Sequence, residues 1–391
     1  MITATALSRA EMRPPADVEE LRTYLQAALE VEHLTIPVYM TGMYSIVPGT
    51  NQPAYFTIRS VVLEEMLHMT LAANLLNAVG GEPSVDFPEF VAGYPAHLPF
   101  SDPSLPLIPL RHFSRTALET FMLIERPRSF VPDPGEETTG WTSIGQFYDA
   151  IRQGLITLEG RQREEHAADP TRPATIFTGP PARQIGPEDF YNSGGEAFPV
   201  TDLKSALLAV ETISDQGEGV EDTIWTSDDT LFGEERQVAH YFRFKEIRAG
   251  RRYGGHDLPR TEPSGPLLDV TWDDAYPIDP EATVDDYPEG TAVRQHADAF
   301  NHRYADLLTL LQYAVAGRPG RMREAVPVML ELRDLAQRLY RNPHPDPDKA
   351  AQGLHASPTF ELLTEHFTQA RARVAPSAPE SALDGGVDRT G

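Results

Sequence analysis

Cysteine is absent from the 391 residues of this chain. Disulfide bonds, thiolate zinc sites and all-cysteine iron–sulfur clusters are therefore excluded. Any metal ion must be held by carboxylate and imidazole groups, which favours iron, manganese or zinc. Glutamate, aspartate and histidine are thus the residue types in which to look for a metal site.

Long apolar runs and basic charge are also scarce. No stretch approaches the roughly 18 consecutive apolar residues that span a bilayer, and the N-terminal segment has no apolar core of signal-peptide type. We therefore expect a cytoplasmic protein that does not enter a membrane. The formal net charge of −25 argues against nucleic-acid binding, because that requires a basic surface.

Apolar residues recur at helical spacing along much of the chain, which predicts an all-α fold. The predicted helices of a four-helix bundle span 17–46, 54–79, 202–216 and 233–249. Weaker patterns at about 114–124 and 143–162, and two C-terminal helices at 291–317 and 319–341, complete the expected set. The first two helices are joined by a short turn, so we expect them to be antiparallel neighbours.

Proline-rich segments separate these helices. The loops at 82–112 and 167–200 are long and carry aromatic residues. Loops of this length are usually functional or disordered; the aromatic residues favour packed loops, and these two are candidates for the lid of a pocket. Residues 1–16 are predicted to be a flexible arm, 17–370 a metal-binding domain and 371–391 a disordered tail.

The strongest chemical signal is the segment EEMLH, in which Glu65 and His68 lie one turn apart on one helix face. Four-helix di-iron proteins present two ligands from one helix by this spacing. A lone pattern of this kind is more often an exposed glutamate beside an ordinary histidine. Here the neighbours Met66, Leu67 and Met69 are apolar, and a carboxylate buried among them needs a partner or a metal ion.

The first predicted helix offers a partner carboxylate, Glu32. It lies about as far from the intervening turn as Glu65 and His68, so the three side chains can converge. Tyr39 follows seven residues later on the same face, where it would tune the site or relay an electron. Glu30 and His33 point elsewhere on the helix, and we interpret His33 as a packing residue or as a support for the ligands.

The second half of a two-metal site is less regular. Glu211 and His240 are candidate ligands on the third and fourth predicted helices, but Gln237 stands three residues before His240, where a glutamate is expected. Three other glutamates are candidates for the missing carboxylate: Glu218, Glu235 and Glu246. We expect Glu235 and Glu246 to be solvated; a site with five protein ligands or a single metal ion also stays open.

Several of these segments together resemble a known family. EVEHLTIPVYMTGMYSI, IRSVVLEEMLHMTLAANLLNAVGG, FYNSGGEAFPVTDL, QGEG and AHYFRFKEI are similar to the ferritin-like domain of the iminophenyl-pyruvate dimer synthases of violacein and indolocarbazole biosynthesis. The resemblance covers residues 17–365 and implies a ferritin-like four-helix bundle with long loops. The metal ligands that it implies are Glu32, Glu65, His68, Glu211 and His240, with Glu218 as a further candidate in the QGEG segment.

The function implied by this resemblance is that of a non-haem dinuclear-iron oxidase or oxygenase of secondary metabolism. It would use dioxygen on a small aromatic or amino-acid-derived metabolite, with two iron ions, or manganese or zinc, as cofactor. An electron donor is a candidate partner, and a homodimer is a candidate assembly. Two alternatives stay open: a non-enzymatic metal-binding protein, favoured by the acidic charge, and a scaffold with a degenerate site, favoured by Gln237.

Overall fold

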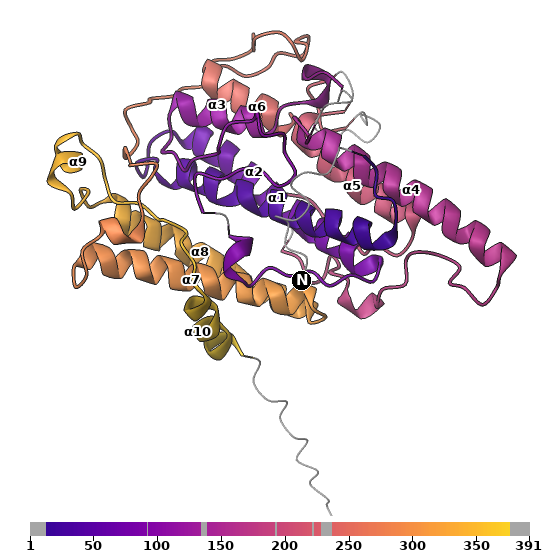
Figure 1. Ribbon diagram of the computed structural model, residues 1–391. Helices are drawn as coiled ribbons and strands as arrows, with labels where there is room; N and C mark the ends of the chain where they lie inside the picture. The colour runs from indigo at the N-terminus through magenta and orange to yellow at the C-terminus, as the bar shows by residue number, and fades with distance from the viewer. Residues whose placement is uncertain are drawn as a thin grey trace, which may run out of the picture.

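The computed structural model describes residues 13–91, 93–133, 139–191, 194–220, 223–227 and 237–375. Across these residues the chain is helical, and its only extended pairings are isolated bridges. The long helices α1 (Val18–Tyr44) and α2 (Gln52–Ala78) lie side by side in the middle of the molecule (Figure 1). None of the helices in this described part is long and apolar enough to cross a membrane.

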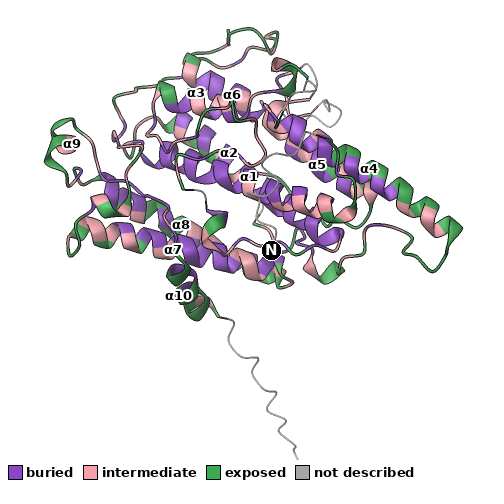
Figure 2. Cartoon of the chain, viewed as in Figure 1, coloured by how far each residue is buried: buried purple, intermediate pink, exposed green. Residues whose placement is uncertain are grey.

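The α1–α2 pair is the framework on which the other helices pack. Asp17 caps α1 by accepting a hydrogen bond from the backbone N–H of Glu20, as the sequence predicts. Pro37 lies inside α1 without ending it. Both helices are buried along most of their length because other helices cover them on two sides (Figure 2).

A four-helix bundle has four parallel or antiparallel columns, and α1 and α2 each form one of them. Each of the other two columns is built from two shorter helices in succession. The helices concerned are α3 (Arg115–Ile124), α4 (Ile144–Ala168), α5 (Leu203–Glu218) and α6 (His240–Ala249). Both α3 and α4 pack against α1, both α5 and α6 pack against α2, and the ring closes through α3 on α6 and α4 on α5. Because α3 and α5 end where α4 and α6 begin, both columns are interrupted beside the middle of α1 and α2.

This arrangement corrects the predicted bundle helices. The segment 202–216 lies in the fourth column, beside α2, and the third column is the α3–α4 pair. The helix predicted for 233–249 begins only at His240, and residues 228–236 lie outside the described part. The weak pattern at 143–162 belongs to a 25-residue helix that packs along α1 and α5. Periodicity located the segments but did not reveal that two columns were broken.

Further helices follow toward the C-terminus: α7 (Ala292–Val315), α8 (Met322–Tyr340), α9 (Pro347–Ala351) and α10 (Thr364–Val374). The predicted pair at 291–317 and 319–341 is confirmed as α7 and α8, which pack on each other and against the α1–α2 pair (Figure 1).

The ends of the chain are ordered further than the sequence predicts. Residues 371–374 are helical rather than disordered, because Phe367 and Ala370 bury α10 against α7 and Arg373 pairs with Asp306 at 2.7 Å. Residues 376–391 lie outside the described part. Of the predicted flexible arm, residues 1–12 also lie outside it, whereas Arg13 forms an ion pair with Glu20 at 2.6 Å.

The loop at 167–200 packs against α2, as its aromatic residues suggest. Asn74 donates hydrogen bonds to the carbonyls of Ile185 at 2.8 Å and Phe198 at 2.9 Å, and it accepts one from the Ile185 N–H. Because Asn74 is fully buried on α2, these bonds satisfy the backbone of a loop that would otherwise lose contact with water.

Candidate metal centre

Five side chains with metal-ligating atoms meet where the two columns are interrupted. They form two groups, Glu32–Glu65–His68 and Glu65–Glu125–His240, and within each group one ligand atom from every residue lies within 4.8 Å of the others. All five side chains are at most 6% exposed. Glu65 belongs to both groups, so each group could hold a metal ion and the two would share one carboxylate.

The contact between Glu65 and His240 tests whether the cluster fits a metal ion. Glu65 Oε1 and His240 Nδ1 lie 2.9 Å apart, within ion-pair distance, yet neither atom makes a hydrogen bond. Two ligands at a right angle on one cation, with bonds of about 2.1 Å, would be separated by about 3.0 Å. Since a buried polar atom without a hydrogen bond is costly, the spacing favours a shared cation between these two atoms.

Both histidines are held with one ring nitrogen toward the cluster. His68 Nε2 donates to Gln216 Oε1 at 2.8 Å, and His240 Nε2 donates to Glu64 Oε2 at 2.6 Å. Arg243 anchors the same Glu64 carboxylate at 2.9 Å. In each histidine the remaining nitrogen, Nδ1, therefore faces the carboxylates. Histidine ligands of metals are commonly held in this way: a partner outside the site binds one ring nitrogen and so leaves the other free to bind the metal.

Each outer carboxylate is held by a tyrosine. Tyr148 donates a hydrogen bond to Glu32 Oε1, and Tyr39 donates one to Glu125 Oε1. The second oxygens, Glu32 Oε2 and Glu125 Oε2, face the histidines at 3.4 and 3.5 Å from Nδ1. Burial raises the pKa of both tyrosines well above the usual 10, so both remain protonated donors.

Burial and the close charges shift the pKa values of the cluster strongly. Burial raises the pKa of Glu32 to about 7. Burial alone would lower the pKa of His68, but the carboxylates of Glu32 and Glu65 outweigh it and raise that pKa to about 10. The cluster without metal therefore retains protons at neutral pH.

Four of the predicted ligands, Glu32, Glu65, His68 and His240, lie in the cluster, and Tyr39 lies beside it. Glu211 does not. The buried face of α5 is formed by Ala206, Ala209, Val210 and Ile213. Successive helical residues turn by about 100°, so Glu211 points away from that face and is exposed.

Gln237 also lies away from the cluster. It precedes the first residue of α6, and its Oε1 accepts a hydrogen bond from Arg243 at 3.0 Å. The carboxylate that the sequence did not show beside His240 is Glu125, which directly follows α3. The apparent gap at Gln237 thus arose from the assumption that the helix extended unbroken through residue 237.

Glu218 lies next to the cluster but in neither group. It lines a cavity of about 20 Å³ together with Glu32, Glu65, His68 and Glu125. A space of this size accommodates about one water molecule. Its carboxylate accepts a hydrogen bond from the backbone N–H of Arg128, and burial raises its pKa to about 7.

The remaining candidates lie elsewhere. Glu246 is buried, contrary to prediction, because it forms an ion pair with Arg252 at 2.6 Å and accepts the Tyr253 N–H at 2.7 Å. Glu235 lies outside the described residues. His33 is a packing residue: its Nε2 lies 2.8 Å from the Tyr304 hydroxyl on α7, and its ring packs on Phe90.

Sequence reasoning missed four residues of the centre, one of which is Gln216, the hydrogen-bond partner of His68. Glu125 follows a short helix and precedes Arg126-Pro127, with no ligand spacing to mark it. Tyr148 lies on α4, where the helical pattern was weak. Glu64 had a visible signal, because it forms a Glu-Glu pair with Glu65, but only the second member has the three-residue spacing to His68.

A surface groove leads to the centre. It has a volume of about 950 Å³ and is lined in part by Arg128, Arg152 and Phe242. Gly145, Ser214 and Glu218 line both this groove and the small cavity at the cluster. Glu218 therefore lies between the solvent-facing groove and the buried carboxylates.

Comparisons with known proteins agree with this architecture. A family model described as Ferritin-like matches residues 25–249. A ferritin-like protein from Caulobacter vibrioides, known from its crystal structure, has the same fold, with a TM-score of 0.57 over 88% of this chain and 99% of that chain at 24% sequence identity.

Two curated relatives are biosynthetic enzymes. The chain is 26% identical over 356 residues to the dichlorochromopyrrolate synthase of Lentzea aerocolonigenes. It is 27% identical over 277 residues to the 2-imino-3-(indol-3-yl)propanoate dimerase of Chromobacterium violaceum. These alignments cover 82% and 63% of this chain but only 31% and 23% of the relatives, so the chain spans a third or less of their length.

Proposed function

The chain belongs to the ferritin-like family, and from this premise we propose that it is a non-haem di-iron oxidase or oxygenase acting on a small metabolite. Its resemblance to enzymes of violacein and indolocarbazole biosynthesis is confirmed by the two curated relatives. The observation that carries the proposal is the pair of buried Glu/His groups that share Glu65.

The proposed ligands follow from the two groups. One ion is held by Glu32, Glu65 and His68, and the other by Glu65, Glu125 and His240. Carboxylate and imidazole ligands without cysteine suit iron, and we assign iron to both positions, with manganese or zinc as alternatives. When bound, iron supplies the capacity to react with dioxygen and to accept electrons from a substrate.

Other residues of this chain orient the proposed ligands and keep water away from them. Tyr148 and Tyr39 orient the outer carboxylates, and Gln216 and Glu64 orient the imidazoles. Tyr39 retains its proton because burial raises its pKa, which suits the proposed role of tuning Glu125 or relaying an electron. The burial of the cluster keeps bulk water out, which strengthens every charge interaction inside it.

The proposed substrate is a small aromatic or amino-acid-derived compound of secondary metabolism. Support comes from the names of the curated relatives, one of which is a dimerase of an indolyl imino acid. The groove beside Glu218 is lined by Arg152, a guanidinium group for a carboxylate, and by Phe242, an aromatic ring, whereas its other arginine, Arg128, is paired with Asp149. The proposal includes dioxygen as co-substrate, an electron donor as partner, a homodimer as assembly and a cytoplasmic location.

The test is anaerobic reconstitution with ferrous iron, followed by rapid mixing with dioxygen. An oxidase predicts about two irons per chain and a transient absorption band after mixing. Accumulation of many irons per assembly would instead support iron storage. Absence of bound iron would support a degenerate site and would contradict the proposal.

A further inference from the structure

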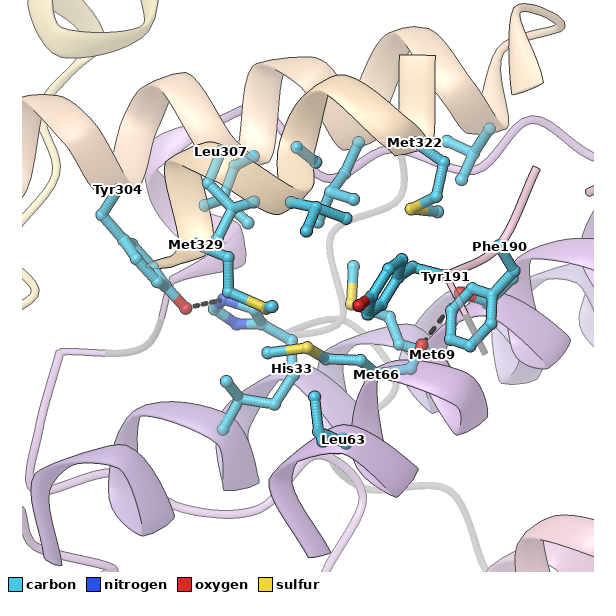
Figure 3. Close-up of a pocket in the computed structure, with 17 residues that line it drawn as sticks. His33, Leu63, Met66, Met69, Phe190, Tyr191, Tyr304, Leu307, Met322 and Met329 are labelled. Carbon is cyan, nitrogen blue, oxygen red and sulfur yellow. Dashed lines mark hydrogen bonds between the residues drawn. The ribbon is translucent and has the colours of Figure 1, made fainter. Parts of the chain in front are cut away.

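A second cavity lies on the other side of α2 from the metal centre. It has a volume of about 80 Å³ and lies between α2 and the α7–α8 pair (Figure 3). Met66 and Met69 line it from the same turns of α2 that present Glu65 and His68 to the cluster. The cavity is thus separated from the proposed reaction by the thickness of one helix.

The walls of this inner cavity are almost entirely apolar and unusually rich in methionine. Four of the nine methionines of the chain line it: Met66, Met69, Met322 and Met329. The hydrogen-bonded pair His33–Tyr304 lies at one end, and Phe190 and Tyr191 lie at the other (Figure 3). Methionine side chains are flexible and adapt their shape to a guest, whereas a finished protein core leaves few voids larger than a water molecule.

An outer cavity of about 490 Å³ continues from the inner one. Leu63, Met66 and Met329 line both, so the two spaces meet at these side chains. The outer space is more polar, and its lining includes Arg59 and Arg333. The pair of cavities is therefore apolar at its inner end and positively charged at its outer end.

Neither arginine is neutralised by an ion pair among the residues that the structure describes. Arg333 lies over the ring of Tyr55 at 5.5 Å. Burial raises the pKa of Tyr44, and the charges of Arg333 and Arg59 oppose that rise, so both guanidinium groups lie near the same hydroxyl. In a chain with 58 acidic and 33 basic residues, two exposed arginines that line one cavity mouth without an ion pair among the described residues favour an anionic ligand.

The volumes of the two cavities indicate the shape of the apolar part of that ligand. The inner cavity is about half the roughly 150 Å³ that admits a benzene ring. An alkyl chain is narrower than a ring, and each methylene that leaves water adds to binding. The inner cavity therefore suits the end of an alkyl chain, and the wider outer cavity suits the rest of the chain and a carboxylate with its water.

We propose that these joined cavities bind a free medium-chain fatty acid. The end of the alkyl chain lies among the methionines of the inner cavity, the rest of the chain continues into the outer cavity, and the carboxylate lies between Arg59 and Arg333. This site does not depend on the proposed oxidase activity, because none of its lining residues belongs to the metal cluster.

The test is calorimetric titration of the iron-loaded 391-residue chain with decanoate, decanol and phenylpropanoate. Decanoate should bind saturably at one per chain and about tenfold more tightly than either comparator. Replacing both arginines, Arg59→Gln with Arg333→Gln, should weaken decanoate about tenfold and leave decanol unchanged. Arg338→Gln, an exposed change on the same helix but outside both cavities, is the matched control and should bind like the parent.

Filling the inner cavity tests the position of the chain. Ala325 lines it and is buried, so Ala325→Leu should weaken decanoate at least about tenfold. Val326→Phe, at a partly exposed wall position, serves if the first variant does not fold; circular dichroism and iron content report folding. Decanoate binding that is absent in the folded parent, unchanged when the cavity is filled, or matched by decanol or phenylpropanoate would overturn the proposal.

Discussion

At the residue scale, the half of the metal centre that follows a helical rule was predictable. Glu65 and His68 are one turn apart on an unbroken helix, and Glu32 lies opposite them on its antiparallel partner. Glu125 and Glu64 were not predicted because their roles depend on contacts between distant segments: Glu125 on Tyr39, and Glu64 on His240. No short spacing in a sequence encodes such a contact.

The role of Glu64 leads to a prediction about affinity. Glu64→Gln removes the charge that orients His240 through its Nε2–H. Loss of such a partner typically weakens metal binding by about 10- to 100-fold, and we expect that loss with the number of irons at saturation unchanged. Ferrous iron titration measures both quantities. Glu211→Gln on the exposed face of α5 is the control, and equal affinities in the two variants would contradict the assigned role.

At the element scale, the centre exists because two bundle columns are broken beside it. The ends of α3 and α5 and the starts of α4 and α6 bring Glu125, Glu218, Tyr148 and His240 to one level. Periodicity predicted the existence of most helices and their rough limits. It did not predict the breaks, since a helix end is set partly by the tertiary contacts of the residues beyond it.

The Gly194–Gly195 segment that precedes α5 has a structural role that can be tested. Gly194 has a φ of +90°, and a Cβ there would lie 2.7 Å from the backbone N of Glu64. Its carbonyl accepts a hydrogen bond from Gln216 Nε2 at 3.4 Å, and Gln216 in turn holds His68. The close approach of this loop to α2 thus supports one of the proposed ligands.

A pair of glycine variants tests the close packing of this segment on α2. Gly194→Ala should lower the free energy of unfolding by roughly 1–3 kcal/mol, because the new Cβ is strained both by φ and by contact. Gly160→Ala is the control: it lies in α4 with nothing within 4 Å of the added Cβ, and it should stabilise the protein by roughly 0.5–1 kcal/mol. Denaturant unfolding measures both changes; equal effects of the two substitutions would contradict the close packing.

At the scale of the whole molecule, the α1–α2 pair separates two chemically different sides. One side holds carboxylates and histidines between α1, α2, α3 and α6; the other holds an apolar space against α7 and α8. The sequence predicted the α7–α8 pair, but the cavity beneath it depends on the way in which the two layers meet. Side-chain types alone do not encode that void.

The metal centre should also make metal binding depend on pH. The pKa of His68 is raised to about 10 and that of Glu32 to about 7, so at pH 7 without metal His68 holds its proton and Glu32 is about half protonated. Metal ligands must lose these protons, and affinity should therefore rise as pH increases from about 6 to 8. Calorimetry in buffers of different ionisation enthalpy counts the protons released; binding without proton release at pH 7 would contradict the assigned ligands.

The most direct measurement of the two-metal centre is the iron content of three matched variants after anaerobic reconstitution and removal of free metal. The shared position of Glu65 predicts that Glu65→Ala loses both irons, and the outer position of Glu125 predicts that Glu125→Ala retains about one. Glu211→Ala should retain about two, like the parent, because Glu211 is exposed and belongs to neither group of ligands. Full iron content in Glu65→Ala, or loss of iron in Glu211→Ala alone, would contradict a dinuclear centre built on Glu65.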